Sequence, residues 1–453
     1  MLKKITAFAI ALIVCSTAMA QKNLPSNFHM KKLANGLEVL VIEDNSVPLV
    51  TIEICVKNGS FTEDSAYNGL SHLYEHMFFK ANKAIPSQEK FLERVNELGI
   101  SFNGTTSDER VNYFFTLSNK LINEGLEFMN NAIRYPLFLE QEMKNENPVV
   151  DGEFQRAESN PAFFLFQDFN KQMWGANYVR KNAIGIHDVI LSATPEKMNV
   201  IKDKYYYPNN SILVIAGDVE HNAVFEKADK MFGDWKPCDF DPFQKWPIPE
   251  FTPLVGQSKF LTVDKNAKMP MGFHGPDTRN DVKSTYAADV FSTILGLTSS
   301  EFQKTLVDGG YALQAGLGYQ TCRYTGPIQL FMVPNPMKLK SFYGKLMEQV
   351  NRFDAPDYFT DEQLETAKNK LIMDDIYNKE KTSAYVHTVT FWWASASIDY
   401  YTTYNDMIKK VTRKDIADYV DKYIKGKPSV TGLLLNPKMK ESLGINSADE
   451  ILK

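Results

Sequence analysis

Residues 72–76 read His72-Leu73-Tyr74-Glu75-His76, two histidines four positions apart with a glutamate beside the second. On a helix this spacing projects both imidazoles from one face, about one turn apart, so that they can share one zinc ion. Glu75 lies on the same side, where it can take a proton from a metal-activated water without being a ligand. The same short pattern also occurs by chance on surface helices, so alone it favours a zinc site no more than an ordinary helix face.

A catalytic zinc ion commonly takes a third protein ligand and keeps one position for water. No other histidine lies nearby in the sequence, so the third ligand is expected to be a carboxylate from the acidic segment 140–158. Most carboxylates of this segment are expected on a solvated helix face, and composition does not choose among them. The candidates are Glu140, Glu142, Glu146, Asp151, Glu153 and Glu158.

The two halves of the chain follow one plan. In each half a threonine opens a helical segment that ends in Lys-Tyr, and a β-rich run follows it. Three pairs of positions share a single offset, which indicates an internal duplication. The pairs are Thr194 with Thr412, Tyr205 with Tyr423, and Ser211 with Ser429.

The pattern of elements predicts an α+β fold with two homologous domains. Apolar runs at 37–43, 49–56 and 113–117 are typical of strands, and the turn residues 44–46 separate the first two. Segments near 66–80, 86–98, 119–134 and 186–205 have helical periodicity. Strands and helices do not alternate strictly, so each domain is expected to hold a mostly antiparallel sheet packed with long helices. The two domains are expected to face each other across a cleft.

Domain limits follow from composition. Residues 1–20 have the charged, apolar and small-residue regions of a cleavable signal peptide, which predicts a periplasmic or secreted protein with no membrane span afterwards. Residues 236–258 are rich in proline and aromatic residues and are expected to be a linker. It separates a metal-binding domain, 21–235, from a domain at 259–453 that lacks the motif, so one zinc ion per chain is expected.

The overall charge excludes one class of partner. The 453 residues have a net charge of −5 and 23% charged residues, which is unlike the basic surface of nucleic-acid-binding proteins. Cys55, Cys238 and Cys322 are too widely spaced for a metal motif and are expected to be buried. Trp174 and the pair Trp392-Trp393 are expected to be core or domain-packing aromatic residues rather than ligand platforms, and His274 is expected to be structural.

Several segments resemble the pitrilysin/insulinase family of inverted-motif zinc peptidases, including its mitochondrial processing peptidase-like two-domain members. Residues 69–80 are similar to the family's Gly-Leu-x-His-x-x-Glu-His-Met-x-Phe-Lys core, and residues 102–107 to its Asn-x-x-Thr segment. Residues 146–161, 206–210 and 216–219 also match family segments, so that the resemblance covers nearly the whole chain after the signal.

The resemblance implies roles for particular residues. It implies zinc ligands at His72, His76 and Glu153, a catalytic base at Glu75 and a supporting catalytic glutamate at Glu146. Pro148 leaves two possibilities: it kinks a continuous helix, or it starts a new helix after Asn147 and leaves Glu146 outside. The substrate is expected to add as an extra strand at Phe102, Asn103 and Gly104.

The second half departs from the family pattern. Members that act as a complete pair of halves carry an arginine seven residues before a tyrosine, and the aligned positions here hold Leu306 and Leu313. A shifted register would place Lys304 and Tyr311 in those positions. The preferred interpretation is a zinc endopeptidase subunit of a heterodimer, whose paralogous partner supplies the missing pair. The alternative is a non-catalytic member that binds peptides or assembles with a partner.

Overall fold

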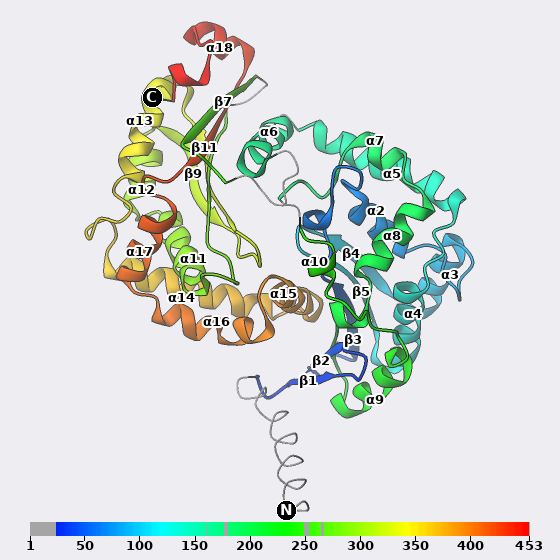
Figure 1. Cartoon of the computed structure of the whole chain (residues 1–453). Coiled ribbons are helices and arrows are strands. Elements are labelled where there is room, and N and C mark those ends of the chain that lie inside the picture. The colour runs from blue at the N-terminus through cyan, green and yellow to red at the C-terminus, as the bar shows by residue number, and fades with distance from the viewer. Residues whose placement is uncertain (1–23, 161, 176–179, 249–252, 264–266, 453) are drawn as a thin grey trace, which may run out of the picture.

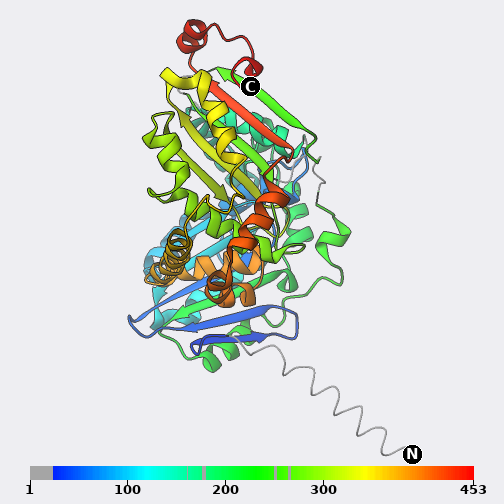
Figure 2. The same cartoon turned by 90° about the vertical axis from the view of Figure 1, so that its left-hand side faces the viewer.

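The computed structural model describes residues 24–452 except 161, 176–179, 249–252 and 264–266, so the predicted signal at 1–20 lies outside the described residues. The described chain forms two lobes, each built around one β-sheet (Figure 1). Turned so that the second lobe faces the viewer, the first lobe lies largely behind it (Figure 2).

The first sheet has the order β1-β2-β6-β3-β5-β4. Only β2 and β6 run parallel; the remaining neighbours are antiparallel. Although residues 44–46 connect β2 to β3, these strands do not pair, because β6 inserts between them. The strands are β1 (Phe28–Lys32), β2 (Glu38–Glu43), β3 (Leu49–Val56), β4 (Ser101–Thr106), β5 (Val111–Ser118) and β6 (Ser211–Gly217).

Within the described residues, the second sheet repeats this topology without a counterpart of β1. Its order is β7-β11-β8-β10-β9, and its single parallel pair, β7 with β11, matches β2 with β6. The α+β fold with two homologous, mostly antiparallel sheets is therefore confirmed. The strands are β7 (Gln257–Val263), β8 (Met269–His274), β9 (Ala312–Tyr319), β10 (Pro327–Pro334) and β11 (Ser429–Leu435).

Helices cover one face of each sheet and form a separate apolar core with it. On the first sheet these are α2 (Leu70–Phe78), α3 (Gln88–Leu98), α4 (Ile122–Arg134), α5 (Glu140–Glu158), α7 (His187–Leu191), α8 (Pro195–Tyr205) and α9 (His221–Phe232). On the second they are α11 (Val282–Gly296), α12 (Glu301–Gln303), α13 (Leu339–Val350), α14 (Asp361–Asn378), α16 (Ile398–Lys410), α17 (Arg413–Tyr423) and α18 (Pro437–Leu443).

Two details differ from the expected elements. The helical segment expected at 186–205 is divided into α7 and α8, because Pro195 starts a new helix after Thr194. The segment expected to be a linker contains the short helix α10 (Pro242–Lys245) and the first two residues of β7.

The two lobes exchange one helix each. Helix α6 (Ala162–Trp174) packs on β7, β8 and β11 of the second sheet, whereas α15 (Thr382–Ser395) packs on β3 and β6 of the first (Figure 1). Trp174 and Trp393 lie in these two contacts, as predicted. His274 is also structural: its ring stacks on Trp174 and its Nε2 bonds the Met173 carbonyl at 2.6 Å.

Polar contacts reinforce the helix exchange. The fully buried Glu53 of β3 accepts a 2.5 Å hydrogen bond from Thr390 of α15 through Oε1. Arg110 donates to the His387 carbonyl at 3.0 Å, and Trp393 Nε1 donates to Glu38 Oε2 at 2.8 Å. The back face of the first sheet is thus sealed by a helix that the second half of the chain supplies.

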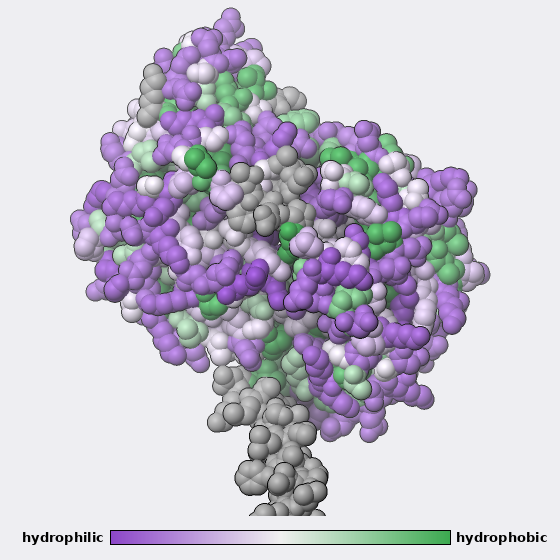
Figure 3. Space-filling view, in the orientation of Figure 1, coloured by the Kyte–Doolittle hydropathy of each residue, from purple (hydrophilic) through white to green (hydrophobic). Residues whose placement is uncertain are grey.

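The three cysteines within the described residues are free and buried, as expected. Within the same part of the chain, every helix is too short or too polar to cross a bilayer. On the face shown in Figure 3, apolar residues form small separate areas among hydrophilic ones.

Candidate active site

Helix α2 carries the His72–His76 motif, and a buried carboxylate starts it. Glu63 accepts hydrogen bonds from the backbone N–H groups of Gly69 at 2.9 Å and Ser71 at 2.7 Å. A negative group at this position satisfies N–H groups that have no partner within the helix and interacts favourably with its dipole. Gly69 has φ 98°, a left-handed conformation that favours glycine and turns the chain into the helix.

His72 and His76 converge on a carboxylate of helix α5. The Nε2 atoms of His72 and His76 lie 3.6 and 3.9 Å from Glu153 Oε2, and the two rings are nearly perpendicular, at 89°. Burial, together with the neighbouring His76, lowers the pKa of His72 to about 4, so this imidazole is neutral at pH 7. A neutral ring keeps the lone pair that metal binding requires.

The three side chains fit a zinc ion. Two imidazole nitrogens and one carboxylate oxygen form a common catalytic donor set, and tetrahedral ligands at zinc stand about 3.4 Å apart. All three ligand atoms lie within 4.8 Å of one another. Glu153 is 38% exposed, so a fourth position on this side is open to solvent or substrate.

Glu146 lies seven residues, about two helical turns, before Glu153 on the same helix. Its carboxylate bonds the His76 ring. Its Oε1 is 2.8 Å from His76 Nδ1, and its Oε2 accepts from Lys80 Nζ at 2.5 Å. Burial alone would raise the pKa of Glu146, but the bonds with His76 and Lys80 outweigh it and hold that pKa below its ordinary value. Occupation of Nδ1 leaves His76 Nε2 to face Glu153.

Helix α5 continues through Pro148, so the second possibility for this proline is wrong. The helix runs without interruption from Glu140 to Glu158, and Asn147 lies inside it, where its Nδ2 donates to the Ala193 carbonyl at 3.1 Å. Because Pro148 has no backbone N–H, the continuous helix lacks one internal hydrogen bond at this position, while α5 packs against α2. Glu146 and Glu153 therefore share one helix.

Glu75 points from α2 toward strand β4. Thr106 Oγ1 donates to Glu75 Oε2 at 2.8 Å, and a methyl group added at Gly104 would meet Glu75 Oε1 at 2.7 Å. Burial raises the pKa of Glu75, which the bond from Thr106 only partly offsets. A carboxylate with a raised pKa is suited to accept and then return a proton.

Strand β4 is the outer strand of the first sheet, with β5 as its single neighbour. Successive residues of β4 point to opposite faces of the strand. Phe102, Gly104 and Thr106 lie on the face toward α2, whereas Asn103 is exposed. Phe102 packs on Phe79, with ring centroids 4.9 Å apart, so its side chain supports the site from within the fold. This strand and the motif residues line one pocket of about 490 Å³.

The two leucines that replace the family's arginine and tyrosine lie in different environments. Leu306 is fully buried in the second core, whereas Leu313 on β9 is 61% exposed. Neither side chain can donate a hydrogen bond. Of the shifted pair, Lys304 is exposed and Tyr311 lies under Lys338 Nζ, 4.5 Å from the ring centre.

Sequence reasoning missed three supporting residues: Thr106, Lys80 and Glu63. Lys80 and Thr106 lie inside the two family-like segments, which is the one signal that could have identified them. Glu63 has no such signal, because a carboxylate at a helix start is common and its burial is visible only in three dimensions.

A second group of similar composition was also missed. His29, Glu43 and His221 have ligand atoms within 4.8 Å, and His221 Nδ1 lies 2.8 Å from Glu43 Oε1. The two imidazoles, however, are stacked at 3.7 Å and 7°. The nitrogen lone pairs of two stacked, parallel rings lie in parallel planes and do not point at a common position. The two imidazoles therefore do not converge on one metal ion.

Comparisons with known proteins place both halves of the chain in one family. Residues 38–185 match "Insulinase (Peptidase family M16)" and residues 192–371 match "Peptidase M16 inactive domain". The chain is 24% identical over 438 residues to zinc protease PqqE of Helicobacter pylori, which covers 94% of this chain and 97% of that protein. It is 25% identical over 363 residues to an uncharacterised zinc protease of Rickettsia felis, covering 80% of this chain and 86% of that one.

Solved structures share the fold. A protease from Helicobacter pylori aligns with a TM-score of 0.80 at 22% identity, over 91% of this chain and 100% of that chain. An M16-like peptidase from Alicyclobacillus acidocaldarius aligns with a TM-score of 0.77 at 16% identity, over 92% and 100%. With both halves matched in order, the chain belongs to the insulinase family of peptidases, family M16.

Proposed function

We propose that this chain is a zinc-dependent endopeptidase that hydrolyses peptides or unfolded polypeptides. The observation that carries the proposal is the convergence of His72, His76 and Glu153 on one point, with Glu75 beside it. The names of the relatives, which are zinc proteases, support the same chemistry.

The protein side of the mechanism follows from these positions. His72, His76 and Glu153 would hold one zinc ion, which supplies polarisation of the peptide carbonyl and acidification of water when bound. Glu75 accepts a proton from the attacking water at its carboxylate and passes it to the leaving amine. Thr106 keeps the Glu75 carboxylate oriented, and Glu146 keeps the His76 ring oriented.

Substrate recognition is proposed at the free edge of β4. An extended peptide can pair with the backbone at residues 102–104, beside Glu75, and so place a carbonyl at the site. Such pairing uses main-chain groups and tolerates many sequences. This suits a peptidase that acts on short or unfolded chains.

A paralogous partner is part of the proposal. The buried Leu306 and the exposed Leu313 offer no hydrogen bond to a substrate, so the arginine and tyrosine would come from a metal-free paralogue in a heterodimer. Full peptidase activity from the isolated chain would refute this. The composition of residues 1–20 supports export to the periplasm or medium as a further proposal.

The substitution Glu75→Gln tests the catalytic role. We expect kcat/KM for a quenched fluorescent peptide to fall about 10³-fold, as for loss of a general base, while zinc content stays at the wild-type level. Glu97→Gln, at an exposed glutamate of α3, is the control and should retain wild-type activity. Cleavage that persists in Glu75→Gln would refute the assigned base. Wild-type protein that binds the peptide without cleaving it would favour the non-catalytic alternative.

A further inference from the structure

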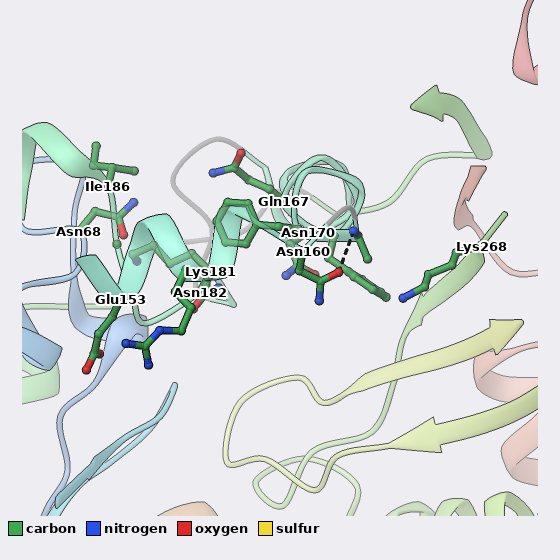
Figure 4. A pocket seen from close by; sticks show the side chains of 15 residues that line it. Asn68, Glu153, Asn160, Gln167, Asn170, Lys181, Asn182, Ile186 and Lys268 are labelled. Atoms are coloured by element: carbon green, nitrogen blue, oxygen red, sulfur yellow. Dashed lines mark hydrogen bonds between the residues drawn. The ribbon is translucent and has the colours of Figure 1, made fainter. Parts of the chain in front are cut away.

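A second cavity of about 680 Å³ adjoins the candidate active site, and Glu153 lines both. Its walls come from the end of α5, from α6, from residues 181–186, and from Lys268, which precedes β8 in the other domain. Figure 4 shows Lys268 reaching in from the side opposite Glu153, with Asn160 and Asn170 between them. A peptide that passes Glu153 would enter this cavity next.

Apart from Glu153, the charged side chains that line this cavity are cations. Arg156 and Lys268 form no ion pair with a carboxylate in the described part of the chain. Lys181, in contrast, is buried, and its Nζ donates to the carbonyl groups of Ser60 at 2.5 Å and Glu63 at 2.7 Å. Two cations are thus available to a ligand.

The acids of α5 that could neutralise Arg156 are engaged elsewhere. Asp151 and Glu158 both bond the ring of His187, Glu158 at 3.2 Å. Glu153 is the third acid, and in the proposed function it is a metal ligand. The positive charge therefore persists in the working state of the site.

Amide side chains on the same walls present donors. Asn160 Oδ1 accepts from the Ala162 N–H at 3.0 Å, and Asn182 Oδ1 accepts from the Ile184 N–H at 3.1 Å. Because both carbonyl oxygens are used, the NH₂ groups remain for a ligand. Asn68 also lines the cavity, and its buried Oδ1 lacks a hydrogen-bond partner among the described residues.

Apolar groups complete the lining. Phe163 and Phe166 on α6 and Ile186 lie on the walls and can pack against a short aliphatic stem. A methylene stem that ends in an anion matches this combination of apolar wall, amide donors and two cations.

We propose that this cavity is a specificity subsite for an acidic residue of the peptide substrate, Glu or Asp, near the scissile bond. The inference rests on the proposed function, since it assumes that a peptide lies at the zinc site. Arg156 and Lys268 act as specificity residues from the two domains, so the subsite is complete only when the domains face each other.

Binding to the zinc-loaded Glu75→Gln chain tests the inference without turnover. The probes are fluorescein-labelled peptides that are identical except for one residue, which is Glu, Gln or Lys, scanned over three positions on each side of the scissile bond. At one position we expect the Glu peptide to bind about 10-fold more tightly than the Gln peptide. The Lys peptide should bind more weakly still, and the preference should shrink as salt is raised.

Variants then assign the preference to the two cations. Adding Arg156→Gln and Lys268→Gln should lower the ratio of the Gln to the Glu dissociation constants from about ten to near one, and charge reversal to Glu at both positions should favour the Lys peptide. Lys171→Gln, at an exposed lysine of α6 outside this cavity, is the control and should keep the ratio.

The outcomes separate the two proposals. Equal binding of the Glu, Gln and Lys peptides to the unmutated cavity overturns the acidic subsite and leaves the peptidase function intact. No binding of any peptide, with zinc present, counts against the proposed function itself. A preference for Glu that survives removal of both cations overturns the assignment to Arg156 and Lys268.

Discussion

His72, His76 and Glu153 have the same composition as His29, Glu43 and His221, yet the two groups differ in what they can bind. In the first group the rings are perpendicular and both Nε2 atoms face one oxygen. In the second the rings are stacked in parallel. Ring orientation, which no sequence pattern encodes, separates the candidate metal centre from a surface cluster.

This difference predicts the zinc stoichiometry. We expect about one zinc ion per chain after dialysis against a weak chelator, measured by plasma mass spectrometry. His72→Ala should abolish bound zinc, because it removes one of three protein ligands. His29→Ala is the matched control and should retain the ion. The assignment fails if zinc is lost from His29→Ala and kept in His72→Ala.

For Pro148, rules based on a residue and its sequence neighbours do not decide between two local structures. Its sequence context allowed a kinked helix or a helix start, and both are ordinary uses of proline. The buried contact of Glu146 with His76 and Lys80 accompanies the continuous helix, and this contact joins residues that are 66 and 70 positions apart. Local propensity could not predict it.

At the level of the elements, strand β4 positions Glu75 as much as helix α2 does. Gly104 leaves the space that the Glu75 carboxylate occupies, so Gly104→Ala should displace this group. We expect kcat/KM to fall about 10²-fold, the cost of a misplaced catalytic group, with zinc content and melting temperature unchanged. Gly318→Ala on β9, where the added methyl meets atoms no closer than 3.7 Å, is the control. Wild-type activity in Gly104→Ala would contradict this account of Glu75.

Helices α11 and α16 predict a pH effect on stability. Asp289 of α11 accepts a 2.7 Å bond from Tyr404 of α16, and burial raises its pKa to about 7. The unfolded carboxyl group has its ordinary pKa near 3.8, so the folded state binds more protons between these values. Ionisation of the buried Asp289 carboxyl group therefore lowers the free energy of unfolding as the pH rises from 4 to 7.

Asp289→Asn removes this proton linkage. The free energy of unfolding of the variant minus that of wild type should be about 1–3 kcal/mol larger at pH 8 than at pH 5. Urea denaturation at both pH values measures it, with the exposed Asp406→Asn as control. A difference between variant and wild type that does not change with pH would refute the role of Asp289.

The positions of the helices and strands along the chain were largely predictable, but which of them pack side by side in space was not. Periodicity located β2, β3 and α2, and the shared offset of Thr194 and Thr412 revealed the duplication. The insertion of β6 between β2 and β3 depends on pairing across more than 150 residues. Likewise, the apolar faces of α6 and α15 indicate burial without indicating which sheet buries them.

For the whole molecule, the helix exchange predicts that the two lobes unfold together. Trp393 of α15 is buried against the first sheet, and Trp393→Ala should cost about 3–5 kcal/mol. Because α15 belongs to the second half of the chain, both lobes should lose hydrogen-exchange protection at the same, lower denaturant concentration. Phe331→Ala, at a half-exposed ring on β10, is the control. Loss of protection in one lobe alone would contradict this coupling.

The exchange also has a consequence during synthesis. The first sheet is complete once Gly217 has left the ribosome, but the helix that seals its back face begins only at Thr382. At ordinary elongation rates of about 5–20 residues per second, that face stays uncovered for roughly 8–33 s. The apolar back face of the first sheet therefore stays open to other chains until the second half has emerged, both at the ribosome and during the proposed passage across the membrane.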